Sequence, residues 1–190
     1  MLDYKLDIEK SVEVLRKHGV ILYPTDTIWG LGCDALQAKA VKKVFGIKQR
    51  EESKSFIVLL ENVSKLTYYI DDIPPVAFDL IEQVKTPLTI IYPKARNLAS
   101  NLISSDGSVA IRIVRDPFCQ QLIDAFSGPI ISTSANVSGE PAPTVFPDIS
   151  PQIVSKADYV VEYKQNVISN IRPSTIIRLT GDWEYDVVRS

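Results

Sequence analysis

The chain has 190 residues, of which 45% are hydrophobic and 23% charged, and its formal net charge is -2. This length can bury one sizeable core, which predicts a single domain over residues 1–190. The net charge disfavours a protein whose main task is to bind a nucleic-acid backbone, although it is compatible with a local basic cleft. No apolar stretch approaches membrane-spanning length, the N-terminus is unlike a signal peptide, and Cys33 and Cys119 lie in no metal-ligand spacing. These features predict a cytoplasmic protein with reduced thiols and no membrane contact.

The hydrophobic pattern predicts helices and strands in irregular alternation. In chain order we expect a helix over 7–18, a strand over 20–23, a helix over 36–46, a strand over 56–60, helices over 63–69 and 75–84, strands over 88–92 and 109–114, a helix over 116–126, and strands over 129–132, 158–163, 174–179 and 185–189. Asp7 is expected to cap the first helix, which Gly19 ends, and Asp116 followed by Pro117 to begin the helix over 116–126. The pattern indicates an α/β fold with a mixed, largely buried sheet.

Polar and glycine residues follow the first strand in the segment "PTDTIWGLGCDA". Thr27 belongs to a group of short polar side chains, and Gly30 and Gly32 permit close approach of another backbone. Ligands of open α/β sheets bind beyond strand ends, so this segment could line a site. An ordinary polar loop, with Asp34 capping the next helix, explains the same residues about equally well.

A basic cluster precedes the strand over 56–60. Lys48, Arg50 and Lys54 could together neutralise a polyphosphate, since lysine supplies a point charge and arginine a planar fork. A solvated helix end, in which cations complement the helix dipole, is the more common explanation of such a cluster.

Arg112 stands inside the apolar strand "VAIRIV". A buried arginine requires a partner, and this one could hold a carboxylate through two hydrogen bonds. An outward-facing position on the strand is an equally good explanation.

Short polar side chains also follow the strand over 129–132, in "STSANVSG". Ser134 and Asn136 are two residues apart, so in an extended chain they project to the same side and could bind a polar ligand. An Asx turn closed by Gly139 is the alternative. Ser174 begins a later apolar strand, where strand propensity alone would explain it.

Several familiar catalytic arrangements are missing from the sequence. His18 is the only histidine and is expected on the surface near a helix end, so no Ser-His-Asp or Cys-His arrangement can be built. There is no Walker motif, no dinucleotide-binding glycine motif and no zinc-binding cluster. Any catalysis would therefore depend on positioning and on charge stabilisation by lysine, arginine and hydroxyl groups.

Taken in order, "YPTDTIWGLGCDA", "KQR", "SVAIRIVRDP", "STSANVSGEPAPT" and "PSTII" resemble the YrdC family of threonylcarbamoyl-AMP synthases, from about Val20 to Arg189. The resemblance implies a twisted mixed sheet flanked by helices around a basic cleft, in a short, single-domain protein. It implies synthesis of threonylcarbamoyl-AMP and pyrophosphate from L-threonine, bicarbonate and ATP, with Mg2+ held mainly by the ATP phosphates. A separate transferase complex would then deliver the product to adenosine 37 of tRNA.

The resemblance also implies roles for individual residues, in three groups. The threonine-binding residues would be Thr27, Arg112, Ser134 and Ser174. The triphosphate would be held by Lys48, Arg50 and Lys54, of which Lys48 and Arg50 would also be catalytic. The other nucleotide contacts would be Ser108, Asn136, Thr144 and Arg189.

This sequence departs from the family pattern at two positions near the expected threonine pocket. Trp29 replaces the usual tyrosine, and Leu59 stands where many members carry a histidine. Two rival functions stay open: an RNA-binding module without catalysis, and a carbamoyl-adenylate-handling domain such as that of hydrogenase maturation proteins. A basic cleft would also permit weak contact between an enzyme of this family and RNA.

Overall fold

The computed structural model describes residues 4–50, 56–167 and 173–190. Its helices are α1 (Lys5–Arg16), α2 (Ala38–Lys48), α3 (Leu66–Tyr69), α4 (Val76–Gln83), α5 (Pro117–Phe126) and α6 (Pro151–Val154). Its strands are β1 (Ile21–Tyr23), β2 (Gly30–Gly32), β3 (Ile57–Leu60), β4 (Leu88–Tyr92), β5 (Val109–Ile113), β6 (Ile130–Ser134), β7 (Tyr159–Val160), β8 (Thr175–Leu179) and β9 (Tyr185–Arg189). Short 3₁₀ turns lie at Val63–Lys65, Ser100–Leu102 and Phe146–Asp148.

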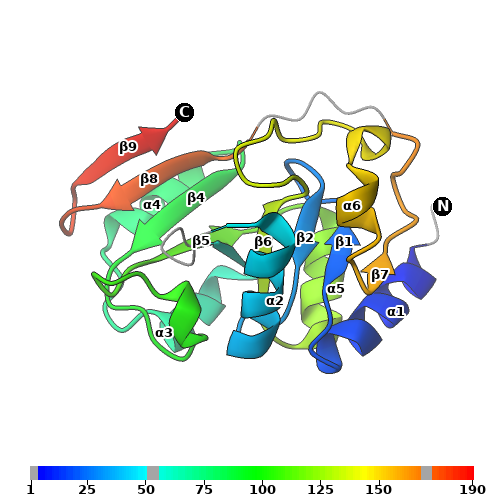
Figure 1. Ribbon diagram of the computed structural model, residues 1–190. Helices are drawn as coiled ribbons and strands as arrows, with labels where there is room; N and C mark the ends of the chain where they lie inside the picture. Colours follow the sequence, from blue (N-terminus) through cyan, green and yellow to red (C-terminus); the bar gives the residue numbers. More distant parts are fainter. Residues whose placement is uncertain (1–3, 51–55, 168–172) are drawn as a thin grey trace.

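The strands form one mixed sheet in the order β7-β1-β2-β6-β3-β5-β4-β8-β9. The pairs β1–β7, β3–β5 and β4–β8 are parallel, and the other neighbours are antiparallel. Figure 1 shows the β8–β9 hairpin at one end of the sheet and β7 with α1 at the other. The predicted α/β class with a mixed sheet and flanking helices is confirmed.

The first helix begins and ends two residues earlier than the pattern predicts. Tyr4 occupies the N-cap position, so the prediction that Asp7 caps the helix is wrong. Asp7 lies instead in the buried first turn, where it accepts hydrogen bonds from the Tyr159 hydroxyl and from the amides of Glu162 and Tyr163. His18, not Gly19, adopts the left-handed conformation after the helix (φ 58°), and it is exposed, as predicted.

Helix α2 lies two residues further along the chain than predicted. Gln37 is its N-cap, and the Asp34 carboxylate accepts a hydrogen bond from the Leu36 amide instead of capping the helix. As a result Lys48 is the last helical residue and is buried. Helix α5 agrees with its prediction: Asp116 caps it through the Cys119 amide.

The segment between the first strand and α2 is not simply a loop, because Gly30–Gly32 forms β2 between β1 and β6. A Cβ atom on Gly32 would lie 2.6 Å from the Tyr23 ring and 2.9 Å from the Ile131 carbonyl oxygen. The close backbone approach expected of the glycines is therefore real. Strand β6 also extends further than its predicted 129–132, so that Ser134 ends the strand.

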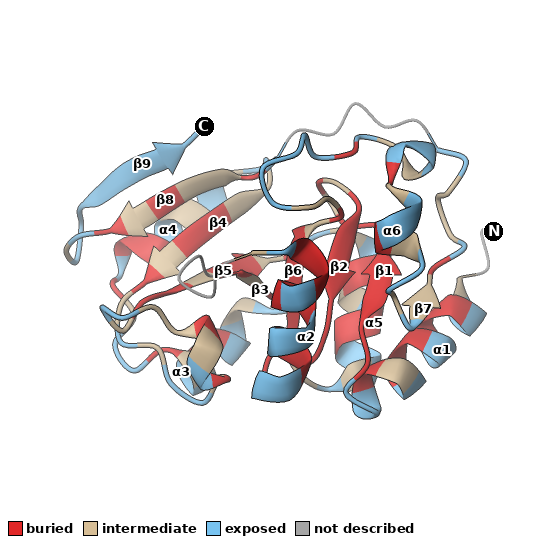
Figure 2. Ribbon diagram, in the orientation of Figure 1, coloured by how far each residue is buried: buried red, intermediate tan, exposed pale blue. Residues whose placement is uncertain are grey.

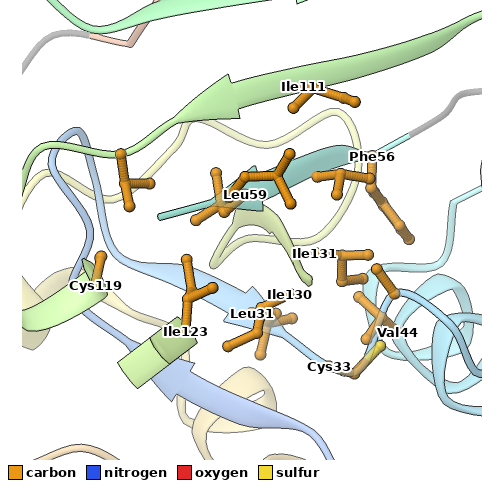
Figure 3. Close-up of a cluster of buried hydrophobic side chains, with 14 of the residues drawn as sticks. Leu31, Cys33, Val44, Phe56, Leu59, Ile111, Cys119, Ile123, Ile130 and Ile131 are labelled. Carbon is orange, nitrogen blue, oxygen red and sulfur yellow. The ribbon is translucent and has the colours of Figure 1, made fainter. Parts of the chain in front are cut away.

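The core runs along the centre of the sheet. Figure 2 shows continuous burial through β1 and β2, whereas β9 is exposed along its whole length. Strand β6 is buried as far as Thr133. Leu59 packs in this core together with Leu31, Phe56 and Ile131 (Figure 3). In the described part of the chain no helix has the length and apolar character needed to cross a membrane.

Candidate functional site

A cleft of about 410 Å³ crosses the face of the sheet from β6 to β9. Alternate residues of the strands project into it, including Ala110 and Arg112 of β5 and Ser132 and Ser134 of β6. Because a strand alternates its side chains between two faces, Ile111 between the two β5 residues and Ile131 before Ser132 enter the core instead. The sheet therefore supplies a rigid floor on which polar groups are held.

The cleft is basic although the chain is slightly acidic. Four arginines line it, namely Arg50, Arg112, Arg178 and Arg189, and its described lining includes no carboxylate. Seven serine or threonine residues add hydroxyl groups. Arg178 is paired with Asp106 outside the cleft at 3.0 Å. This wall suits a ligand that carries several negative charges and also offers hydrogen-bonding groups.

Arg112 lies at the wall of the cleft with only 3% of its side chain exposed. One of its terminal nitrogens (Nη2) is 3.0 Å from Oδ1 of Asp26, which is 11% exposed. These two atoms are not aligned for a hydrogen bond, and the Nε donor of Arg112 is likewise unsatisfied. Burial raises the pKa of Asp26, and the Arg112 charge opposes that rise. Of the two explanations left open by the sequence, the outward-facing surface position is thereby excluded.

Unsatisfied donors of a buried guanidinium cost free energy unless a ligand accepts from them. Arg112 forms an ion pair with Asp26, and the described residues leave its Nε and Nη2 donors without a hydrogen-bond partner. A carboxylate bound next to these donors would satisfy them. Asp26 was not among the residues expected at the site; its position next to Thr27 was the only signal in the sequence.

Hydroxyl groups from separate segments line the same cleft. Thr27 contacts the Thr25 hydroxyl at 2.9 Å, and Ser174 contacts the Thr89 hydroxyl at 2.8 Å. Arg189 donates to the Ser174 carbonyl oxygen at 2.8 Å through Nη2. The fold thus brings β8, β9 and the segment before β2 together around one cavity.

Ser108 and Arg50 lie on other parts of the cleft wall. The Ser108 hydroxyl donates to Asp106 at 2.6 Å. The Arg50 guanidinium lies over the Phe56 ring at 5.3 Å, and burial lowers the pKa of this arginine. Burial and the Arg112 charge likewise lower the pKa of Arg189. These positive charges are concentrated where water is partly excluded, which strengthens their attraction for anions.

Lys48 and Asn136 are not among the described residues that line the cleft. Lys48 is 1% exposed, and its ammonium group donates to the carbonyl oxygens of Ser134 and Asn136, both at 2.6 Å. Burial and the nearby Arg50 charge lower the pKa of Lys48 to about 8. The amide nitrogen of Asn136 donates to the carbonyl oxygens of Val137 and Glu140. The fold thus brings the Lys-x-Arg and Ser-x-Asn motifs together through hydrogen bonds from Lys48 to the carbonyl oxygens of Ser134 and Asn136.

Thr144 and Lys54 are the two remaining predicted residues. Thr144 is exposed and lines a separate cavity of about 60 Å³ with Trp29 and Lys164. Lys54 lies outside the described residues. Trp29, which replaces the expected tyrosine, is buried against the Phe146 ring, with the ring centres 4.9 Å apart.

Seven of the eleven predicted residues therefore lie around one cavity: Thr27, Arg50, Ser108, Arg112, Ser134, Ser174 and Arg189. Arg178 and Phe56 line it as well and were missed, because neither stands in a motif. A mixed α/β sheet with a basic, hydroxyl-lined cleft defines a class of protein that binds an anionic ligand on the sheet face.

Comparison with known proteins identifies the family within this class. The family model Sua5_yciO_yrdC, described as "Telomere recombination", matches residues 13–190. The chain is 32% identical to threonylcarbamoyl-AMP synthase of Pseudoalteromonas translucida over 172 residues, which are 89% of this chain and 91% of that protein. It is 37% identical to the enzyme of the same name from Psychromonas ingrahamii over 87% of this chain and 83% of that protein. The chain belongs to the Sua5/YciO/YrdC family.

Solved structures agree with this assignment. P. abyssi Sua5 in complex with L-threonine superposes with a TM-score of 0.85 at 26% identity, covering 97% of this chain and 54% of that one. The chain therefore spans about half the length of that protein. E. coli YciO superposes with a TM-score of 0.84 at 27% identity, covering 99% of this chain and 90% of that one.

Proposed function

We propose that this protein is a threonylcarbamoyl-AMP synthase, which forms threonylcarbamoyl-AMP, pyrophosphate and water from L-threonine, bicarbonate and ATP. The observation that carries the proposal is the buried Arg112, which lines a basic cleft and whose Nε and Nη2 donors have no hydrogen-bond partner among the described residues. Relatives that carry this enzyme name at 32–37% identity support it, as does a similar structure in complex with L-threonine.

Threonine would bind at the Arg112 part of the cleft. The guanidinium would donate hydrogen bonds to the amino-acid carboxylate, and the hydroxyl groups of Thr27, Ser134 and Ser174 would contact the polar atoms of threonine. A fixed carboxylate also fixes the position of the amine, so the nitrogen would be held where it can react with carbon dioxide derived from bicarbonate. Leu59 is buried in the core next to Arg112, its partner in the β3–β5 register, and is not among the residues that line the cleft.

ATP would occupy the part of the cleft near Arg50 and Arg189. Arg50 would hold the phosphates, with Lys54 as a further contact outside the described residues, and Ser108 would contact the nucleotide. Mg2+ would enter bound to the ATP phosphates and would supply positive charge next to the leaving pyrophosphate. Thr144 lies in a neighbouring small cavity, so its contact with the nucleotide would need movement of its loop.

The reaction brings two anions together, and the charge of the cleft suits that task. The threonine nitrogen forms a bond to carbon dioxide and loses a proton, which gives a carbamate. A carbamate oxygen then attacks the α-phosphorus of ATP, and the bond from that phosphorus to the pyrophosphate oxygen breaks. Arg50 would stabilise the charge on the leaving pyrophosphate, and Arg112 would hold the threonyl group in line.

The product would be consumed by a transferase that moves the threonylcarbamoyl group to adenosine 37 of tRNA, in the cytoplasm. The mixed anhydride between a carbamate and a phosphate is reactive towards amines and water, so a separate transferase complex must take it up quickly. The arginines that line the cleft would also permit a weak contact with that RNA.

The test is to incubate the protein with ATP, Mg2+ and bicarbonate, with and without L-threonine, and to measure pyrophosphate and the adenylate. Threonine-dependent formation of both is expected. Adenylate formation from carbamoyl phosphate without threonine would favour the carbamoyl-adenylate function instead. RNA binding with steep salt dependence and no ATP turnover would favour the binding module.

A further inference from the structure

The ammonium group of Lys48 is enclosed by oxygens of one short segment. It donates to the carbonyl oxygens of Ser134 and Asn136, both at 2.6 Å. The side-chain oxygens of the same two residues lie at 3.5 Å (Ser134 Oγ) and 3.3 Å (Asn136 Oδ1). All four oxygens belong to the Ser-x-Asn motif, and the lysine belongs to the Lys-x-Arg motif.

A main-chain bond reinforces this contact. The Ser138 amide donates to the Lys48 carbonyl oxygen at 2.8 Å. Lys48 therefore binds the segment 134–138 through its main chain as well as through its ammonium group. On its other side the segment is attached to the chain before β2, since the Ala135 amide donates to the Trp29 carbonyl oxygen at 3.0 Å. Ser134 is the residue of this segment that lines the cleft.

The geometry leaves Lys48 little capacity for a phosphate. An ammonium group has three donors, and two of them are used by carbonyl oxygens at short distance. The side chain is 1% exposed and does not line the cleft. To reach a phosphate it would have to abandon these bonds and leave two carbonyl oxygens without their donor. Arg50, in contrast, lines the cleft directly.

We infer that Lys48 is a positioning residue: it holds the segment 134–138 against the end of α2 and thereby sets Ser134 at the wall of the cleft. Arg50, and not Lys48, contacts the ATP phosphates directly. The first statement depends on the structure alone, and the second rests on the proposed function.

Hydrogen–deuterium exchange of the ligand-free protein tests the positioning role without any substrate. In Lys48→Met the amides of residues 134–138 should exchange about ten-fold faster or more, as expected for loss of a hydrogen bond from a charged donor. Lys42→Met removes an exposed lysine from the same helix and should leave these amides unchanged. Exchange of 134–138 within two-fold of wild type in Lys48→Met would overturn the inference.

A second variant covers the case in which Lys48→Met does not fold. Lys48→Gln keeps an uncharged donor at the same place, and its 134–138 amides should exchange at a rate between those of wild type and a fully released segment. Wild-type exchange in Lys48→Gln, combined with a ten-fold loss of ATP affinity, would contradict the inference.

A kinetic experiment on Lys48→Met gives a second test, and it rests on the proposed function. A displaced segment 134–138 should raise KM for threonine as well as for ATP, whereas loss of a phosphate contact should raise KM for ATP alone. If Lys48→Met raises KM for ATP alone, the positioning role is overturned, but the proposed function is not. If the wild-type protein forms no threonylcarbamoyl-AMP, the proposed function fails, and the exchange experiment still decides the role of Lys48.

Discussion

Replacement of Arg112 by lysine tests the threonine pocket most sharply. Lysine keeps a positive charge near Asp26 but lacks the planar fork that can bind a carboxylate through two donors. Loss of one hydrogen bond to a charged group costs about 1.5–3 kcal/mol, which corresponds to roughly a 10- to 150-fold loss of affinity. We therefore expect Arg112→Lys to raise KM for threonine by one to two orders of magnitude, while KM for ATP changes by about two-fold or less.

The assay is pyrophosphate release measured over a matrix of threonine and ATP concentrations. The double variant Asp26→Asn/Arg112→Met serves as a control, because it removes the guanidinium without leaving an unpaired buried carboxylate. It should lose threonine affinity at least as strongly and should still unfold cooperatively. A rise in KM for ATP alone, with threonine affinity unchanged, would refute the division of the cleft.

Three further predictions concern charge and stability. Arg50→Ala should lower turnover by about 10²-fold at saturating threonine, as for loss of one electrostatic donor, and near-normal product formation would refute its role. Burial raises the pKa of Asp26 above its value in the unfolded chain. Above pH about 4 the folded state therefore binds more protons than the unfolded state. The free energy of unfolding then falls as the pH rises, until the pH passes the raised pKa. Asp26→Asn should remove the contribution of this carboxyl and so reduce the fall in urea titrations above pH about 4, and an unchanged pH dependence would contradict the shift. Asp7→Ala should cost about 2–4 kcal/mol of unfolding free energy, because the Glu162 and Tyr163 amides lose their buried acceptor; a urea midpoint equal to that of wild type would contradict this.

Most of the sheet could be predicted from apolar runs, since buried strands need no other signal. The exception is β2, whose Gly30 and Gly32 are residues that strands usually lack. Packing explains them: a side chain at Gly32 would collide with the Tyr23 ring and the Ile131 carbonyl. Such a requirement arises only once three strands are side by side, and no local pattern in the sequence reveals it.

Site residues that stand in motifs at the ends of strands could be predicted from the sequence. Residues whose position depends on contacts between distant segments could be predicted less well. Arg112 could be recognised as anomalous, but its partner Asp26 is far away in the sequence and becomes apparent only when β5 is placed in the sheet. Lys48 was expected just beyond the helix over 36–46, in a cluster of cations that is more commonly a solvated helix end. The helix continues to Lys48 and ends at Gln49 with φ 50°, and the Lys48 ammonium group donates to the carbonyl oxygens of Ser134 and Asn136.

The central claim is that one cleft binds threonine, bicarbonate and ATP and that an adenylate forms there from all three. Mass spectrometry with ¹³C-bicarbonate and ¹⁵N-threonine tests it directly in the wild-type protein. The account predicts one adenylate that carries both labels, formed together with pyrophosphate and absent when threonine is left out. An adenylate that lacks the nitrogen label, or pyrophosphate release that is independent of threonine, would contradict it.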